Sequence, residues 1–252
     1  ILQTGTVVID KKTYELDTDG SLKDYTPKKK SSKKKSSGKS DTSDKSGTST
    51  AKKSVALTFD DGPSSFTDRL LDCLEENNAK ATFFMVGTEI ASFPDEVKRM
   101  KKLGCELGNH TYDHKDLATL SSDEISSEIA RVDEQLVNLT GEGASVVRPP
   151  YGSVNDTVKS TVGTPMILWS IDTLDWKTQD VESTVEEVMN NVKDGSIILM
   201  HDIFSTSVDA AEILIPQLIE EGYQIVTVHE LASLHQTELS TGVTYGEFNR
   251  IK

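Results

Sequence analysis

Short apolar runs alternate with longer amphipathic stretches along most of this chain. Seven runs predict strands, at 55–60, 81–86, 106–110, 146–148, 166–171, 196–201 and 223–228. Stretches with apolar residues at helical spacing predict helices, at 65–77, 94–103, 122–139, 154–162, 181–192, 207–221 and 229–235. Strands that alternate with helices form a parallel sheet with crossover helices. Seven such units predict an α/β fold, a closed or nearly closed (β/α) barrel.

The first 53 residues do not follow this alternation. Thr6–Asp10 and Thr13–Leu16 are short strand-like runs, and a turn follows at Asp19-Gly20, so residues 1–26 are predicted to contain a β-hairpin. Residues 27–53 consist largely of Lys, Ser, Thr and Gly. They cannot bury apolar surface and are predicted to form a disordered, flexible linker. The remaining residues, 54–252, are enough for one globular domain.

Charge is unevenly distributed between these parts. The linker has ten lysines against two aspartates, whereas residues 54–252 have 34 acidic and 14 basic side chains. An acidic domain argues against nucleic acid as a partner, because phosphate binding needs a basic face. We interpret the linker as a solvated tether. A second hypothesis is that residues 1–53 also contact an anionic cell-wall polymer.

Cysteines and apolar stretches give few further clues. Cys73 and Cys105 lie among leucines, which favours buried free thiols, and one bridge between them stays open as an alternative. No stretch has the ~20 apolar residues that a transmembrane helix needs. The sequence begins at Ile1 without Met, so the lack of a signal peptide gives no information about export.

Polar side chains gather at the carboxyl ends of the predicted strands. They are Asp60 and Asp61 after the first strand, His110 after the third, Arg148 after the fourth, Asp172 and Asp175 after the fifth, and His201 after the sixth. In α/β barrels this end of the sheet carries the active site. We therefore expect these side chains to lie close together.

Two of these groups have the composition of a metal site. His110 and His114 are four residues apart, and Asp60 and Asp61 are adjacent. Two imidazoles and one carboxylate hold a zinc ion and leave a position open for water. The second carboxylate would be free to act as a base. Each group alone could also be a solvated turn or loop. Their common position favours a metal-dependent hydrolase.

Five motifs occur in order between Val55 and Leu234. They are Thr58-Phe59-Asp60-Asp61-Gly62-Pro63, His110-Thr111-x-x-His114, Arg148-Pro149-Pro150-Tyr151-Gly152, Asp175-Trp176 and Leu199-Met200-His201. Together they resemble the motifs of polysaccharide deacetylases, the NodB-homology domains of carbohydrate esterase family 4. The resemblance implies a distorted (β/α) barrel.

The resemblance also implies roles for the motif residues. Asp61, His110 and His114 would bind a divalent metal, with zinc preferred and cobalt, nickel or manganese as alternatives. The catalytic residues would be Asp60 as general base, Arg148 holding it, His201 as general acid and Asp175 supporting that histidine. The substrate-binding residues would be Tyr151, whose N–H would contribute to an oxyanion hole, and Trp176 and Leu199, which would line the acetyl pocket.

The implied activity is removal of N-acetyl groups from N-acetylglucosamine in a cell-wall polysaccharide, with release of acetate. Peptidoglycan is favoured because Gly5-Thr6 and Asp19-Gly20-Ser21-Leu22 resemble one choline-binding-type cell-wall repeat, without its usual Trp. This substrate implies a protein outside the cell or associated with the cell wall.

Other functions fit parts of the sequence. Chitin oligosaccharides or O-acetylated xylan would suit the same catalytic residues. A non-haem iron oxygenase also uses two histidines and one carboxylate, although Asp60, Arg148 and His201 argue against it. A non-catalytic cell-wall-binding protein with a vestigial site is a third alternative, and the five intact motifs argue against it.

Overall fold

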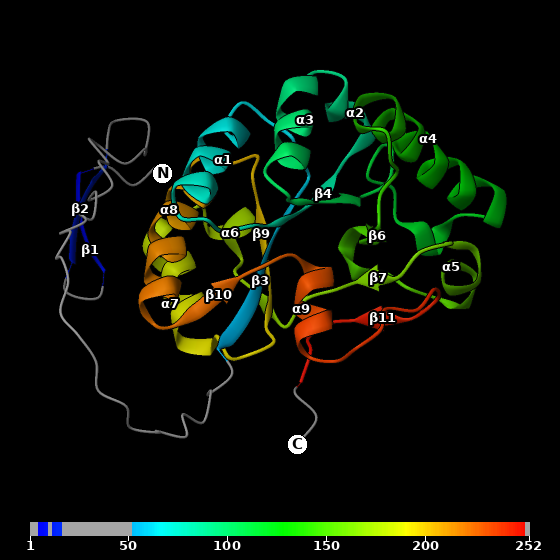
Figure 1. Ribbon diagram of the computed structural model, residues 1–252. Coiled ribbons are helices and arrows are strands. Elements are labelled where there is room, and N and C mark those ends of the chain that lie inside the picture. The colour runs from blue at the N-terminus through cyan, green and yellow to red at the C-terminus, as the bar shows by residue number, and fades with distance from the viewer. Residues whose placement is uncertain (1–4, 10–11, 17–51, 250–252) are drawn as a thin grey trace, which may run out of the picture.

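The computed structural model describes residues 5–9, 12–16 and 52–249, with side chains from 52 to 249 (Figure 1). Strands β1 (Gly5–Ile9) and β2 (Lys12–Leu16) pair in antiparallel fashion, which confirms the strands of the predicted hairpin. Most of the predicted linker and the turn of the proposed wall repeat lie outside the described residues. The boundaries of the three predicted units therefore stay predictions.

In the part from 52 to 249, nine strands form one curled sheet in which every ladder is parallel. The order along the sheet is β11-β7-β6-β5-β4-β3-β9-β8, and β10 pairs beside the start of β3. The strands are β3 (Lys53–Asp60), β4 (Thr82–Met85), β5 (Glu106–Asn109), β6 (Val146–Val147), β7 (Met166–Ile167), β8 (Ile171–Asp172), β9 (Ile197–His201), β10 (Tyr223–Ile225) and β11 (Thr244–Tyr245).

The predicted parallel, barrel-like sheet is confirmed, with nine strands in place of about seven. The predicted strand 166–171 is divided into β7, which pairs with β6, and β8, which pairs with β9. This one segment therefore starts at one side of the sheet and ends at its far edge, which curls the sheet toward closure. The second additional strand, β11, belongs to the C-terminal tail, where no element was predicted.

Helices surround the curled sheet (Figure 1). All seven predicted helices are present, and their ends lie within two residues of the expected positions. They are α1 (Thr67–Glu76), α3 (Pro94–Lys102), α4 (Ser122–Thr140), α5 (Asp156–Thr161), α7 (Val181–Asn191), α8 (Ser205–Glu220) and α9 (Val228–Leu234). The short elements α2 (Gly87–Ile90), α6 (Asp175–Thr178), η1 (Leu117–Thr119) and η2 (Pro150–Gly152) were not predicted.

Local sequence explains where the longest helix begins. The Ser121 hydroxyl accepts a hydrogen bond from the Glu124 N–H, and the Glu124 carboxylate accepts one from the Ser121 N–H. This reciprocal capping box satisfies two backbone donors that a helix start would leave unpaired. α4 ends at Gly141, whose left-handed conformation suits glycine.

The core confirms the interpretation of the cysteines. Cys73 and Cys105 are buried free thiols, so the alternative of a bridge between them is wrong. Burial raises the pKa of Cys73 to about 12 and that of Cys105 to about 11, so both thiols stay protonated at neutral pH.

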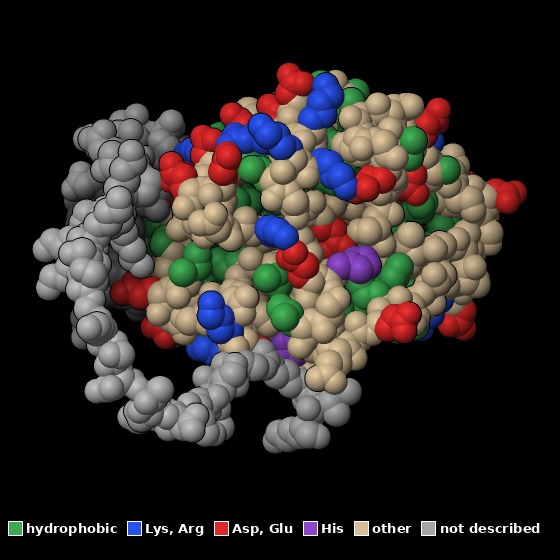
Figure 2. Space-filling model, viewed as in Figure 1, with side chains coloured by type: hydrophobic (Ala, Val, Ile, Leu, Met, Phe, Trp, Pro, Cys, Tyr) green, Lys and Arg blue, Asp and Glu red, His purple; other side chains and the backbone are tan. Residues whose placement is uncertain are grey.

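Among the described helices, none has the length and apolar character required to cross a bilayer. Acidic and basic side chains are interspersed over the face shown in Figure 2.

The C-terminal tail completes the core on the side of β7. The Phe248 side chain is buried, and its N–H donates to the Gly195 carbonyl at 2.9 Å. Gly195 has a φ of 92°, and a Cβ there would lie 1.6 Å from the Phe248 carbonyl oxygen. A side chain at this position would displace the tail, so glycine is required.

We predict that Phe248→Ala lowers the free energy of unfolding by about 3–5 kcal/mol, because a large buried aromatic side chain is lost and a cavity remains. Val243→Ala is the matched control, since Val243 lies in the same tail but is 43% exposed. Urea denaturation of both variants measures the difference. Equal unfolding midpoints would show that the tail is not part of the core.

Candidate active site

The predicted polar side chains meet at the carboxyl ends of the parallel strands. The pairing of β3 with β9 places Asp60 directly opposite His201 and Thr58 opposite Leu199. A cavity of about 370 Å³ opens at this position. Its lining residues are Asp60, Asp61, His110, His114, Pro149, Tyr151, Trp169, Asp172, Trp176, Leu199 and His201. The structure thus brings together eight of the ten predicted site residues, and the other two, Arg148 and Asp175, are buried and contact Asp60 and His201.

Asp61, His110 and His114 form the predicted metal-ligand triad, with one ligand atom from each within 4.8 Å of the others. Asp61 Oδ1 lies 3.5 Å from His110 Nε2 and 3.4 Å from His114 Nε2. Two atoms that each lie about 2.1 Å from a tetrahedral zinc ion are about 3.4 Å apart. Asp61 Oδ1 is buried and has no hydrogen-bond partner within residues 52–249. The three side chains therefore fit a divalent cation.

The tautomer of His110 is fixed by its surroundings. Its Nδ1 lies 2.7 Å from the backbone carbonyl oxygen of Arg148, so Nδ1–H donates there and the Nε2 lone pair faces Asp61. Burial lowers the pKa of His110 to about 3, which keeps the imidazole neutral. A neutral imidazole with a free nitrogen is the form that binds metal.

The loops that carry these side chains have unusual backbones. Asp61, Thr111, His114 and Tyr151 have φ angles of 71°, 68°, 57° and 60°, in the left-handed region that favours glycine. Such conformations cost on the order of 1–3 kcal/mol each and concentrate at functional sites. The turn after Asp61 also requires glycine, because a Cβ on Gly62 would lie 2.1 Å from a carboxylate oxygen of the buried Asp202.

Arg148 lies outside the lining of the cavity and binds the Asp60 carboxylate. Its side chain is fully buried, and Nη1 donates to Asp60 Oδ1 and to Thr58 Oγ1, both at 2.7 Å. Nε and Nη2 donate to the carbonyls of Ile167 and Leu168. Arg148 therefore binds Asp60 through a single nitrogen, because the two backbone carbonyls accept from the others.

The Asp60 carboxyl is buried at the edge of the cavity. It is 3% exposed, and burial raises its pKa above the ordinary value, which the charge of Arg148 offsets only in part. Its second oxygen, Oδ2, lies 3.6 Å from His110 Nε2. A carboxylate with a raised pKa accepts a proton more readily than an exposed one.

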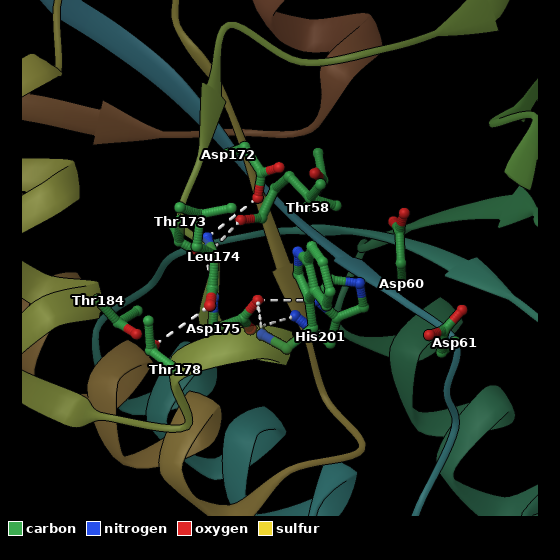
Figure 3. Close-up of polar contacts among 12 residues, drawn as sticks. Thr58, Asp60, Asp61, Asp172, Thr173, Leu174, Asp175, Thr178, Thr184 and His201 are labelled. Atoms are coloured by element: carbon green, nitrogen blue, oxygen red, sulfur yellow. Dashed lines mark hydrogen bonds and ion pairs between the residues drawn. The ribbon is translucent and has the colours of Figure 1, made fainter. Parts of the chain in front are cut away.

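His201 is paired with a buried acid. Asp175 Oδ1 lies 2.8 Å from His201 Nδ1, and Asp175 Oδ2 accepts the His201 backbone N–H at 2.8 Å (Figure 3). Burial alone would lower the pKa of this imidazole. The hydrogen bond and charge of Asp175 outweigh it, together with two nearby carboxylates, and raise the pKa to about 9. His201 is therefore protonated at neutral pH, with Nε2–H as its remaining donor.

The rim of the cavity is aromatic. Tyr151 is 69% exposed with its ring edge-on to His114, and Trp176 is 48% exposed, whereas Leu199 is buried in the wall. The Tyr151 N–H has no acceptor within the described residues. Three further lining residues, Pro149, Trp169 and Asp172, were not assigned a role from sequence. Trp169 lies within the predicted strand 166–171 with no motif around it, and Asp172 was recognised only by its position at a strand end.

The remaining histidines lie away from this cavity. His229 Nδ1 contacts Glu106, and His235 is buried against Ser54 and Asp194. A larger cavity of about 670 Å³ lies near the amino ends of β3 and β4, where β10 and α9 line it. It contains none of the motif residues, so the smaller cavity is the better candidate.

We predict that Asp175→Asn lowers the pKa of His201 from about 9, because burial remains and the partner that raises the pKa most is lost, while Asp60 and Asp61 stay nearby. NMR titration of the imidazole in the metal-free protein measures it, with the exposed Asp156→Asn as control. The pKa of His201 in the folded protein lies above its value of ~6.5 in the unfolded chain. The His201–Asp175 pair therefore contributes its full stabilisation of the fold below pH ~6.5. This stabilisation is lost as the pH rises through 9. An unchanged titration midpoint in the variant would contradict this assignment.

Comparisons with known proteins agree with this geometry. The sequence profile of the polysaccharide deacetylase family matches residues 47–164. The peptidoglycan-N-acetylmuramic acid deacetylase PdaC of Bacillus subtilis is 41% identical over 181 residues, 71% of this chain and 39% of that protein. A peptidoglycan-N-acetylglucosamine deacetylase of Bacillus cereus is 42% identical over 194 residues, 74% of this chain and 70% of that protein.

A solved structure extends the comparison to the fold. The family 4 acetyl xylan esterase of Clostridium thermocellum, in complex with a cobalt ion, has a TM-score of 0.74 at 33% identity. The match covers 77% of this chain and 98% of that one. The chain spans 39% of the length of the PdaC relative. With the sequence profile, the Bacillus cereus relative and the shared fold, the chain belongs to the polysaccharide deacetylase family.

Proposed function

We propose that this chain is a metal-dependent hydrolase that removes acetyl groups from N-acetylglucosamine residues of peptidoglycan. The observation that carries the proposal is the content of one cavity. A triad suited to a divalent cation shares it with a buried carboxylate of raised pKa and a protonated imidazole. These are the parts that amide hydrolysis needs: a cation site, a base and an acid.

Asp61, His110 and His114 would hold the cation. When bound, it would supply polarisation of the acetyl carbonyl and acidification of a water molecule toward a pKa of ~7. Zinc suits two imidazoles and one carboxylate, and cobalt is the ion in the related esterase structure. Zinc and cobalt are therefore the first candidates for the metal ion.

The other residues would move protons and hold the reacting group. Asp60 would take a proton from the attacking water, and its single bond to Arg148 leaves Oδ2 available for this step. The Tyr151 N–H would donate to the developing oxyanion, a contribution of about 3 kcal/mol for such donors. His201 Nε2–H would protonate the departing amine, and Asp175 would keep that proton in place between turnovers.

The choice of sugar rests on the charge of the cavity. Its lining within the described residues includes no Lys or Arg, and Asp172 adds a carboxylate to it. In a glycan whose peptides have been removed, N-acetylmuramic acid carries a free lactyl carboxylate, which the Asp172 carboxylate would repel, whereas N-acetylglucosamine is neutral. Relatives named for each of the two sugars are known, so the charge of the cavity decides our preference. A peptidoglycan substrate also implies that the protein acts outside the cell or at the cell wall.

We predict that the purified chain releases acetate from N-acetylglucosamine oligomers, that a chelator abolishes release, and that added zinc or cobalt restores it. Asp60→Asn should lower turnover by at least 10²-fold, since a positioned base contributes 10²–10⁴-fold. It should retain its bound metal, whereas His114→Ala should lose it. The exposed Asp123→Asn is the control. Full turnover by Asp60→Asn, or by the chelated protein, would overturn the proposal.

The sugar preference has a separate test. We expect a higher kcat/KM on N-acetylglucosamine residues than on N-acetylmuramic acid residues in glycans of equal length. Asp172→Asn should reduce the ratio of the two kcat/KM values by a few-fold. The change should come from a lower KM for N-acetylmuramic acid residues, because the variant removes one negative charge near the substrate. Equal activity on both sugars in the wild type would contradict the preference, and faster acetate release from acetylated xylan would favour the alternative substrate.

A further inference from the structure

The loop between the two histidine ligands is held in a conformation that its sequence does not favour. Thr111 has a φ of 68° and His114 a φ of 57°. A positive φ is a clear outlier for a β-branched residue such as threonine. Conformations of this kind persist only where surrounding contacts enforce them. The contacts that enforce this loop therefore determine where the second histidine lies.

One buried carboxylate supplies two of these contacts. Glu128 lies on α4 and is 4% exposed. Its Oε2 accepts the backbone N–H of Tyr112 at 3.0 Å and that of Asp113 at 3.2 Å. The third N–H between the ligands, that of Thr111, donates to the Asn109 side chain at 2.8 Å. Two of the three backbone donors between His110 and His114 thus end on a single oxygen from a neighbouring helix.

The carbonyl side of the loop is held from α2. The N–H groups of Gly87 and Thr88 donate to the carbonyls of Thr111 and Tyr112 at 3.1 and 3.0 Å. A Cβ at Gly87 would lie 2.5 Å from the Tyr112 ring and 3.0 Å from its Cα, so the approach requires glycine. The loop is therefore clamped between the start of α2 and the middle of α4.

The two histidines depend on this clamp to different degrees. The His110 ring is anchored independently, because its Nδ1 donates to the Arg148 carbonyl at 2.7 Å. Within residues 52–249 no hydrogen bond orients the His114 ring, which is 30% exposed and touches Asp61, the His110 ring and Tyr151. The position of His114 therefore follows from its backbone, and through the backbone from Glu128.

We propose that Glu128 is a positioning residue that sets the spacing between His110 and His114 for a divalent cation. The inference rests on the proposed function, in which these histidines bind metal. Outside the clamp, Glu128 Oε1 pairs with Lys115 Nζ at 3.2 Å, so the buried carboxylate is neutralised from the solvent side. Loss of such an outer partner typically costs 10–100-fold in metal affinity.

Four variants of the full chain distinguish the effect of the length of the Glu128 side chain from the effect of its negative charge. Glu128→Ala removes both acceptors. Glu128→Asp keeps the charge but is one methylene shorter, and Glu128→Gln keeps an oxygen at the same reach without the charge. Glu134→Ala is the matched control, since Glu134 is exposed on the same helix. The dissociation constants for zinc and cobalt are measured by competition with a chelator. Amide hydrogen exchange at Tyr112 and Asp113 is measured in the metal-free protein.

We expect Glu128→Ala and Glu128→Asp to bind metal 10–100-fold more weakly than the wild type and to exchange both amides faster. Glu128→Gln should stay within a few-fold of the wild type, and Glu134→Ala should be unchanged. If Glu128→Ala does not fold, the Asp and Gln variants decide the question. Wild-type affinity in Glu128→Asp, or affinity as weak in Glu128→Gln as in Glu128→Asp, would overturn the inference. A wild-type protein that binds neither metal would refute the proposed function itself.

Discussion

The guanidinium of Arg148 joins the strands on which the candidate site depends. It donates to Asp60 and Thr58 on β3 and to two carbonyls at the end of β7. The carbonyl of the same residue accepts His110 Nδ1 from the end of β5. A fully buried charge is tolerated when it is paired and hydrogen-bonded. Removing either member of a buried pair typically costs about 3–5 kcal/mol. One arginine therefore holds the proposed base through its guanidinium and one proposed metal ligand through its backbone carbonyl.

The surroundings of Asp60 and His201 differ although the two residues are opposite each other in one ladder. Asp60 is buried and bonded to Arg148, and its pKa is raised mainly by burial. His201 has an acidic partner on Nδ1 and is charged at neutral pH. Asp60 and His201 thus have different electrostatic environments at one cavity, as the proposed base and acid of hydrolysis require. The parallel pairing of β3 with β9 places both side chains at one cavity.

The sequence predicted most of the sheet, the seven main helices and the meeting of the polar residues at the strand ends, whereas Tyr151, Trp176 and Leu199 were expected only from the resemblance to polysaccharide deacetylases. It could do so because parallel strands present their carboxyl ends at one edge, so that residues far apart in sequence converge. It did not predict Glu128, whose contacts are to backbone N–H groups and leave no motif. It also missed the division of 166–171 into β7 and β8, because a change of pairing partner does not alter the hydrophobic pattern. The tail strand β11 and the lining residue Trp169 were missed for a similar reason, since each depends on a tertiary neighbour.

The most direct test of this account is anomalous X-ray diffraction from crystals of the chain soaked in zinc or cobalt. The account predicts one strong peak bonded to Asp61 Oδ1, His110 Nε2 and His114 Nε2, with Asp60 outside bonding distance and still paired to Arg148. A peak elsewhere, or an ion bonded to Asp60 in place of Asp61, would contradict it.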